Sequence, residues 1–352
     1  MPVLDRYLAR QAMVYVGGAT LVLVVLFVLV TLGDELNKLG EAYSTGDAVL
    51  VALAQGPRWL FELFPSALLI GLVMATAALV GRSELVAMQA GGYSLVRQAG
   101  VVAVLALISA SLVAIAYDRL GPEAQVWVAQ IKGGRGGEAL LQGDALWVRE
   151  GDAVVLYRGL SETRVAWVER FRLQEDRLLE YERMEDVRRA PSGQWRAARW
   201  LHWSLEAGVR RETATDRPVA LRVDRRLVEL AGKGGEQMGL LELRAAIDSL
   251  RRHGLEAARY EVSYYGRLLF PLYALNLALL GFLLGARRRV GRTAASRSVV
   301  MGLLVGIGAY LANSLVDYAV VLYRIGVWEG KLAFQLALLA VNLMLLQSLR
   351  RI

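Results

Sequence analysis

Few side chains in this sequence belong to the types that carry catalytic chemistry. The 352 residues include no cysteine and two histidines, His202 and His253, and neither histidine has a second metal ligand at helical spacing. The lack of cysteine excludes disulfides, thiolate metal sites and cysteine nucleophiles. The sequence contains no P-loop, no Gly-x-Ser-x-Gly segment and no acidic cluster suited to a two-metal site. We therefore predict a non-catalytic chain that binds no metal or cofactor and draws any energy it uses from a partner.

The polar segment with the clearest pattern is the loop of residues 81–93, which lies between two apolar runs. Ser83 is suited to cap a short helix, Glu84 favours its first turn, and the Gly91-Gly92 pair suits its end. Such a helix places three residues on one face: Leu85, Met88 and Gln89. We expect this face either to dock in a groove of a partner protein or to lie in the lipid interface.

The apolar residues are gathered into runs long enough to cross a bilayer. Hydrophobic residues make up 55% of the chain and charged residues 21%, and a span needs about 20 consecutive apolar residues. Six segments meet this requirement: 11–33, 63–81, 99–117, 268–286, 298–316 and 332–349. The first is followed by charged residues rather than by a small-residue cleavage site, so we interpret it as a retained span.

The distribution of charge predicts the orientation of these spans. One set of segments holds eleven arginines against two acids, Asp5 and Glu84. These arginines are Arg6, Arg10, Arg82, Arg97, Arg287, Arg288, Arg289, Arg292, Arg297, Arg350 and Arg351. The opposite short loops, 33–61 and 317–331, hold four basic and six acidic residues. Because basic loops stay in the cytoplasm, we predict that both termini are cytoplasmic and that the middle of the chain lies outside the membrane on the opposite side.

The segment between the third and fourth spans is charged and has the pattern of strands. Short runs rich in Val, Leu, Trp and Tyr are separated by turn signals; they lie at 145–149, 153–159, 164–172, 178–188, 194–205 and 219–223. Residues 119–132 and 239–259 look helical and flank these runs. We predict a membrane α + β protein with three transmembrane helices on each side of an inserted β sandwich or jelly roll.

A resemblance to a known family sharpens this prediction. Residues 82–92, Arg-Ser-Glu-Leu-Val-Ala-Met-Gln-Ala-Gly-Gly, closely resemble the signature loop of the lipopolysaccharide export permeases LptF and LptG. The Val-Leu-Asp-Arg-Tyr of residues 3–7, the Leu-Trp-Val-Arg of 146–149 and the segment 259–272 look more like LptG than LptF. The resemblance covers the whole chain. It implies spans one to three in residues 1–117, a periplasmic jelly roll with helical connectors in 118–260, and spans four to six in 261–352.

The resemblance also implies a function and a set of partners. Family members extract lipopolysaccharide from the outer leaflet of the bacterial inner membrane and pass it to a periplasmic bridge. The implied partners are an LptF-like permease, a dimer of an LptB-like ATPase that binds ATP and Mg²⁺, an LptC-like single-span protein and an LptA-like bridge. Nucleic acid is not among them. Residues 82–92 would be the coupling helix that contacts the ATPase, through Arg82, Ser83, Glu84, Leu85, Met88 and Gln89.

Three basic residues are the substrate-binding candidates that the resemblance implies. Lys38 follows the first span, Arg58 precedes the second, and Lys132 lies in the outward extension of the third. In LptG-like proteins, basic residues at such positions hold the lipid A phosphates, and arginine can bind phosphate bidentately. The alternative is that each side chain merely extends to lipid headgroups.

Three other functions compete with this interpretation. The chain could have the LptF role instead of the LptG role. It could be a subunit that relays ATPase strokes to a periplasmic partner without carrying lipid, for which we would expect four spans rather than six. A membrane-bound enzyme acting on lipid or glycan would need clustered acids or a metal site, which the sequence does not contain.

Overall fold

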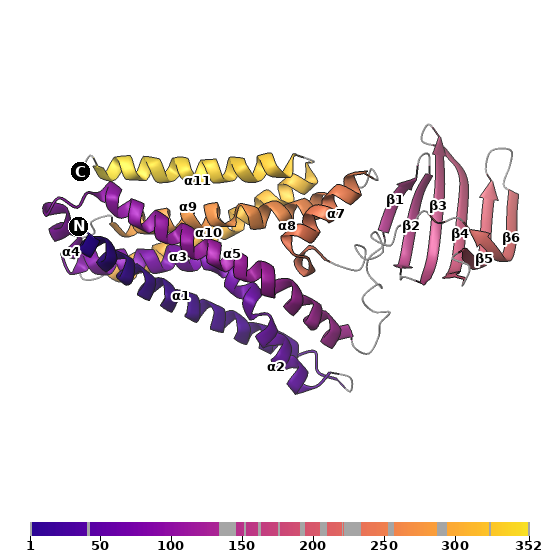
Figure 1. Cartoon of the computed structure of the whole chain (residues 1–352), viewed down its shortest axis with the longest axis horizontal. Coiled ribbons are helices and arrows are strands. Elements are labelled where there is room, and N and C mark those ends of the chain that lie inside the picture. Colours follow the sequence, from indigo (N-terminus) through magenta and orange to yellow (C-terminus); the bar gives the residue numbers. More distant parts are fainter. Residues whose placement is uncertain are drawn as a thin grey trace. The chain divides into compact units, whose positions relative to one another are not determined.

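The computed structural model describes residues 2–40, 43–133, 146–150, 153–160, 163–174, 177–190, 194–204, 210–219, 221, 234–252, 257–286, 294–323 and 325–350. The helices before the strands are α1 (Pro2–Leu36), α2 (Thr45–Ala54), α3 (Gly56–Gly81), α4 (Glu84–Ala90) and α5 (Leu95–Gly133). The strands are β1 (Leu146–Glu150), β2 (Ala153–Leu160), β3 (Arg164–Gln174), β4 (Arg177–Arg189), β5 (Trp195–Ser204) and β6 (Arg210–Val219). A 3-10 turn, η2 (Gly235–Gln237), precedes α7 (Leu240–Arg252), α8 (Ala258–Leu268), α9 (Phe270–Ala286), α10 (Ala294–Leu322) and α11 (Val327–Arg350). Figure 1 shows these elements along the chain.

The helices that can cross a membrane agree with the predicted spans. Within the described residues, α1, α3, α5, α10 and α11 are each long and apolar enough, and α8 with α9 pass the same test as a pair bent by 54°. The bent pair brings the total to the six that we predicted. Pro271 accounts for the bend, because proline has no N–H to donate to the carbonyl of Arg267 four residues earlier. α5 continues to Gly133, so the predicted boundary between residues 117 and 118 falls inside a helix.

Glycine allows α3 to approach two neighbouring helices closely. A Cβ atom on Gly281 of α9 would collide with the backbone carbonyl of Leu69 in α3. A Cβ on Gly71 of α3 would lie 2.6 Å from the Cα of Val16 in α1. Lipid tails are as apolar as leucine, so membrane helices associate through such close packing rather than through removal of apolar surface from water.

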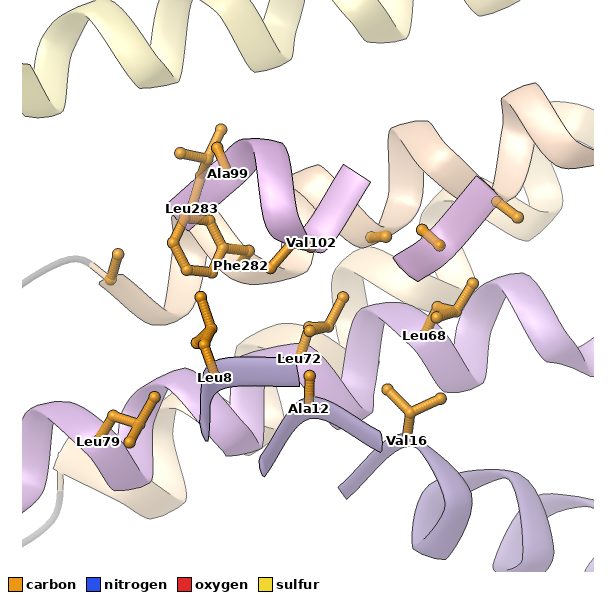
Figure 2. Close-up of a cluster of buried hydrophobic side chains, with 14 of the residues drawn as sticks. Leu8, Ala12, Val16, Leu68, Leu72, Leu79, Ala99, Val102, Phe282 and Leu283 are labelled. Atoms are coloured by element: carbon orange, nitrogen blue, oxygen red, sulfur yellow. The ribbon is translucent and has the colours of Figure 1, made fainter. Parts of the chain in front are cut away.

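Aliphatic side chains fill the space between α1, α3, α5 and α9. Leu8, Ala12 and Val16 recur every four residues and form one buried stripe of α1. Figure 2 shows this stripe facing the rest of the cluster, whose other labelled members are Leu68, Leu72, Leu79, Ala99, Val102, Phe282 and Leu283. Four helices that are distant in sequence therefore share one core.

Buried amides join α9 to α11. The side-chain amide of Asn276 donates to the backbone oxygen of Gln335 at 3.2 Å and to its Oε1 at 3.1 Å. Asn342 donates to the backbone oxygen of Asn276 at 2.9 Å. All three residues are buried, and a polar group away from water is costly unless it is hydrogen-bonded. These bonds therefore fix the register between the two helices.

The chain divides into two compact units, residues 1–128 with 261–352, and residues 129–260. In the second unit the six strands form one antiparallel sheet in the order β1-β2-β3-β4-β5-β6. The predicted β domain, inserted between helices, is confirmed. Each described strand pairs with its neighbours in sequence, and the Greek-key connections that complete a jelly roll are not among these described pairings.

The sixth strand lies elsewhere than predicted. We expected it at 219–223, whereas β6 covers Arg210–Val219, residue 221 is not in a strand, and residues 220, 222 and 223 lie outside the described part of the chain. Its sequence, Arg-Arg-Glu-Thr-Ala-Thr-Asp-Arg-Pro-Val, is mostly polar and most of its side chains are exposed. β6 is the last strand of the described sheet, and such a strand is held by its backbone ladder and needs no apolar alternation.

A row of five residues interrupts the ladder at the same level in β2 to β6. The strand register is the same on both sides of the row, but within the row the residues that face each other on neighbouring strands do not pair. These residues are Gly159, Ala166, Asp186, Ala198 and Asp216. The backbone is left-handed in alternate strands, with φ of 61° at Gly159, 48° at Asp186 and 53° at Asp216. The row changes which alternate residues of a strand face the core. Val165 and Val168 are both fully buried, although residues three apart in a regular strand face opposite sides.

The close approach of α3 and α9 leads to a first prediction. Gly281→Ala should destabilise the helical unit by about 1–3 kcal/mol, because the new methyl group meets the Leu69 backbone, which cannot rotate away. The measurement is the thermal unfolding of the full chain in detergent. Gly100→Ala is the matched control, since a Cβ there would have no neighbouring atom within 4 Å. Equal stability of the two variants would contradict the packing described above.

Candidate functional site

The loop selected from the sequence forms the short helix α4, at the end of the helical unit where α3 ends and α5 begins, here called the α4 end. Gly92 follows it with φ of 83°, as suits a helix end. The prediction that Ser83 caps α4 is wrong. Ser83 has a left-handed backbone, with φ of 58°, and its side chain makes no cap hydrogen bond. A capping serine normally has an extended backbone, which aims its hydroxyl at the N2 or N3 amide.

The face of α4 that we expected to meet a partner is turned inward. Leu85 and Met88 are 3% and 7% exposed and belong to the aliphatic core shared by α1, α3, α5 and α9. Neither side chain is therefore available to a groove on another protein in this conformation. The outward face instead presents Val86, Ala87 and Ala90, with Gln89 half-buried.

Glu84 connects α4 to the start of α1. Its Oε2 accepts a hydrogen bond of 2.7 Å from the Tyr7 hydroxyl, and the Arg82 guanidinium lies 3.9 Å from its Oε1. The Glu84 side chain keeps 32% of its surface exposed. The carboxylate can therefore hold Tyr7 and still meet a cation from outside the chain.

A second polar cluster joins α1 to α5 beside α4. The buried Tyr93 donates to Asp5 Oδ1 at 2.6 Å, and Arg97 donates to Asp5 Oδ2 at 3.0 Å. Gln98 donates to the Tyr93 backbone oxygen at 2.9 Å. Burial, and then the hydrogen bond to Asp5, raise the pKa of Tyr93 well above its ordinary value, so the hydroxyl remains a donor. Sequence analysis missed this cluster, because its members are 88 and 92 residues apart.

An apolar pocket of about 610 Å³ lies between α1, α3 and α5. Aliphatic residues such as Leu21, Leu60 and Leu105 make up most of its wall. Of its polar residues, Thr20 and Ser109 donate their hydroxyls to carbonyls of their own helices, at 2.8 Å in both cases. Ligand pockets typically measure roughly 300–1,000 Å³. This pocket offers dispersion contacts and few donors, which suits a hydrocarbon chain.

Two of the three predicted substrate-binding cations lie at the opposite end of the helical unit, here called the α2 end. Lys38 Nζ lies 2.9 Å from Glu35 Oε1, and Arg58 Nε donates to Glu62 Oε1 at 2.8 Å. Arg58 is next to Pro57, which lines the pocket. Each cation is thus paired with a carboxylate of its own chain. The spacings of three and four residues could have revealed both pairs from sequence.

The third predicted cation, Lys132, is the next-to-last residue of α5 and belongs to the second compact unit. It is exposed and has an interaction partner within the chain. Of the basic loop predicted at 287–297, residues 287–293 lie outside the described part of the chain.

Two further ion pairs join helices of the bundle and were also missed. Arg267 of α8, 7% exposed, lies 3.7 Å from Asp118 of α5, and Lys331 of α11, equally buried, lies 2.5 Å from Asp317 of α10. A charge near an apolar span is costly unless it is paired. Charged residues beside apolar runs could have indicated from sequence that ion pairs form there, but only the fold shows which residues pair.

Comparison with known proteins gives consistent matches. The family model described as "Lipopolysaccharide export system permease LptF/LptG" matches residues 6–348. The chain is 23% identical over 347 residues to the lipopolysaccharide export system permease protein LptG of Haemophilus influenzae, with 94% of each chain covered. It is 22% identical over 362 residues to the protein of the same name from Escherichia coli K12, with 98% of each chain covered.

The inward face of α4 generates a second prediction. Leu85→Ala should cost about 2–5 kcal/mol of stability, because it removes a buried side chain from the shared core. Val86→Ala, on the neighbouring outward face, should change stability by less than about 0.5 kcal/mol. Thermal or urea unfolding of the full chain in detergent measures both. If Val86→Ala destabilises the chain as much as Leu85→Ala, our assignment of the two faces is wrong.

Proposed function

The chain belongs to the LptF/LptG family of lipopolysaccharide export permeases, and from this premise we propose that it is the LptG-type, non-catalytic membrane subunit of an ABC transporter. An LptF-like chain is its membrane partner, and a dimer of an LptB-like ATPase, which binds ATP and Mg²⁺, supplies the energy. An LptC-like single-span protein and an LptA-like bridge receive the lipopolysaccharide. The shared name of the two relatives favours LptG over LptF.

The proposed orientation places the α4 end in the cytoplasm of a bacterial inner membrane. Arg82 and Arg97 lie at this end with the start of α1 and the end of α11, as the preference of arginine for the cytoplasmic side requires. The α2 end, with Lys38 and Arg58, then faces the periplasm, as does the β domain. In this orientation α4 is accessible to a cytoplasmic ATPase.

The observation that carries the proposal is the connection of the pocket helices to α4. α3 leads into α4 through Arg82 and Ser83. α1 is bound to α4 by Tyr7 and Glu84, and to α5 through Asp5, Tyr93 and Arg97. A displacement of α4 by an ATPase therefore moves all three helices that line the apolar pocket. This arrangement can change the pocket's volume without any catalytic residue in the chain.

The energetics of the substrate explain why such a connection is needed. Removing an acyl chain from a bilayer costs about 0.8 kcal/mol per exposed CH₂. The pocket lowers this cost, since its aliphatic wall replaces part of the contact that the acyl chain makes with the bilayer. Arg58 at its edge and Lys38 beyond α1 would meet the phosphates, whereas Lys132 belongs to the other compact unit. In doing so the phosphates compete with Glu35 and Glu62 for the same cations.

The two contacts of Glu84 lead to a third prediction. Tyr7→Phe removes the internal hydrogen bond of Glu84 but leaves its carboxylate. Because α1 stays bound to α5 through Asp5, Tyr93 and Arg97, export should stay within about twofold of wild type. Glu84→Ala also removes the charge offered to the ATPase. It should lower export roughly tenfold or more while ATP hydrolysis continues, because charge-assisted hydrogen bonds contribute about 1.5–3 kcal/mol. The measurement is lipopolysaccharide release per ATP hydrolysed by the reconstituted complex. An equal loss in both variants would show that Glu84 acts by holding α1 rather than by contacting the ATPase.

The export function itself is tested by photocrosslinking in membranes that contain the co-expressed partners. A photoreactive residue at Leu60, in the pocket wall, should form an adduct with lipopolysaccharide that decreases when ATP is hydrolysed. The matched control is the same residue at Leu304 of α10, which is 61% exposed and outside the pocket. There we expect adducts that do not respond to ATP. Lipopolysaccharide adducts that are equal at both positions, or absent at Leu60, would contradict the transport pocket.

A further inference from the structure

Three arginines face one another across the sheet of the β domain. Arg164 of β3 is directly opposite Arg188 of β4, which is directly opposite Arg196 of β5. Directly opposite residues of antiparallel strands share one face, with their Cβ atoms about 4.5–5.5 Å apart. The neighbouring Val165, Val187 and Ala197 are fully buried, so this arginine row lies on the outward face. Like charges in such positions destabilise a sheet unless acids lie between them.

Two aspartates of the ladder interruption orient the arginine row. Asp186 Oδ1 accepts a 2.8 Å bond from Arg164 Nε, and Asp186 Oδ2 accepts one of 2.8 Å from Arg188. Asp216 accepts from the Nε of Arg196 at 2.8 Å. Arg188 lowers the pKa of Asp186, and Arg196 lowers that of Asp216, so both carboxylates are ionised at neutral pH.

The positions of these aspartates are themselves costly. Both have a left-handed backbone, a conformation that costs a residue other than glycine about 1–3 kcal/mol. The left-handed row keeps the core residues on both sides of it buried, and at the same level it places the two aspartates beside the outward arginines.

The arginine row borders a pocket of about 380 Å³, whose lining includes the small residues Ala190 and Ala198. Arg188, Arg189 and Arg196 line it together with Asp186 and Asp216. With Arg164, which is bound to Asp186, the described groups at this site are four arginines and two aspartates, a net charge of +2. The side chains of Arg164, Arg188 and Arg196 are 49%, 67% and 43% exposed. The site is thus open to a ligand and electropositive.

Guanidinium chemistry identifies the class of ligand. Arg188 and Arg196 each direct Nε and one terminal nitrogen at an aspartate. Arg196 makes a third bond, to the Asp216 backbone oxygen. A guanidinium has five N–H donors in a planar fork, so both arginines keep donors for a second anion. A phosphate group has the charge and the oxygen geometry to accept from two such forks at once. A carboxylate has fewer oxygens to span neighbouring strands.

We propose that the row Arg164–Arg188–Arg196, oriented by Asp186 and Asp216, is a binding site for a phosphate group. The phosphate is either free or carried on a lipid headgroup. The site lies within the β domain, so the proposal goes beyond the export function and does not depend on it. It is also distinct from Lys38 and Arg58, which belong to the other compact unit.

The experiment uses the full chain in dodecyl maltoside and phosphate-free buffer, with a photoreactive residue at Ala198. One arm titrates inorganic phosphate against chloride of equal ionic strength and follows the thermal shift. The other arm adds dihexanoyl phosphatidic acid, a soluble lipid with a phosphate monoester, and scores its adduct at Ala198. The test variant changes Arg164, Arg188 and Arg196 to Gln. The control variant changes Arg170, Arg172 and Arg199, which are paired with acids elsewhere on the sheet, to Gln.

We expect phosphate to bind the wild type and the control variant, and to bind the test variant at least roughly tenfold more weakly, as the loss of one charge-assisted bond requires. Tighter binding of the lipid than of phosphate identifies a headgroup as the source, whereas equal binding identifies the phosphate group alone. The proposal is overturned if neither probe exceeds the chloride control, or if both variants lose binding equally. Should the triple variant fail to fold, Arg188→Gln alone, which removes the most exposed member of the row, is subject to the same criteria.

Discussion

The close packing of α3 against its neighbours is the constraint on which the rest of the helical unit depends. In lipid there is little gain from hiding apolar surface, so the bundle needs backbones that approach to van der Waals distance. Gly71 and Gly281 provide that approach, towards α1 and α9 respectively. One end of α3 lines the apolar pocket and its other end leads into α4. The distance between the pocket and α4 is therefore fixed by a single helix that its neighbours hold on two sides.

Polar groups join the helices of the helical unit at its α4 end. α1 is bound to α4 by the hydrogen bond between Tyr7 and Glu84. It is bound to α5 at the same end through Asp5, Tyr93 and Arg97. The pocket wall offers few hydrogen-bond donors to a ligand, since the Thr20 and Ser109 hydroxyls donate to carbonyls of their own helices. Directional bonds thus join the helices, whereas the pocket wall offers mainly non-directional apolar contact.

The β domain shows the opposite balance, because it departs from regular sheet structure in a coordinated way. Gly159, Asp186 and Asp216 take the left-handed conformation at one level of the sheet, and Ala166 and Ala198 leave room between them. The alternation of inward and outward side chains is offset by one residue there, so that apolar residues on both sides of the row face the core. The aspartates of this row are the residues that hold the arginines. One distortion thus serves the packing of the core and the orientation of the outward charges.

The sequence by itself determined the spans, the inserted β domain, five of the six strands and the existence of α4. Each of these follows from local patterns, namely apolar runs as long as a bilayer is thick, β-rich segments between turns, and a short loop with glycines at its end. Tertiary structure alone decided which face of α4 is buried, since Leu85 and Val86 are both apolar and only the position of the core distinguishes them. It also decided the position of β6, whose pairing comes from its neighbour's backbone rather than from its own side chains. The clusters that bind α1 to α4 and α5 needed the fold for the same reason, because residues far apart in sequence choose their partners by proximity in space, which no local pattern encodes.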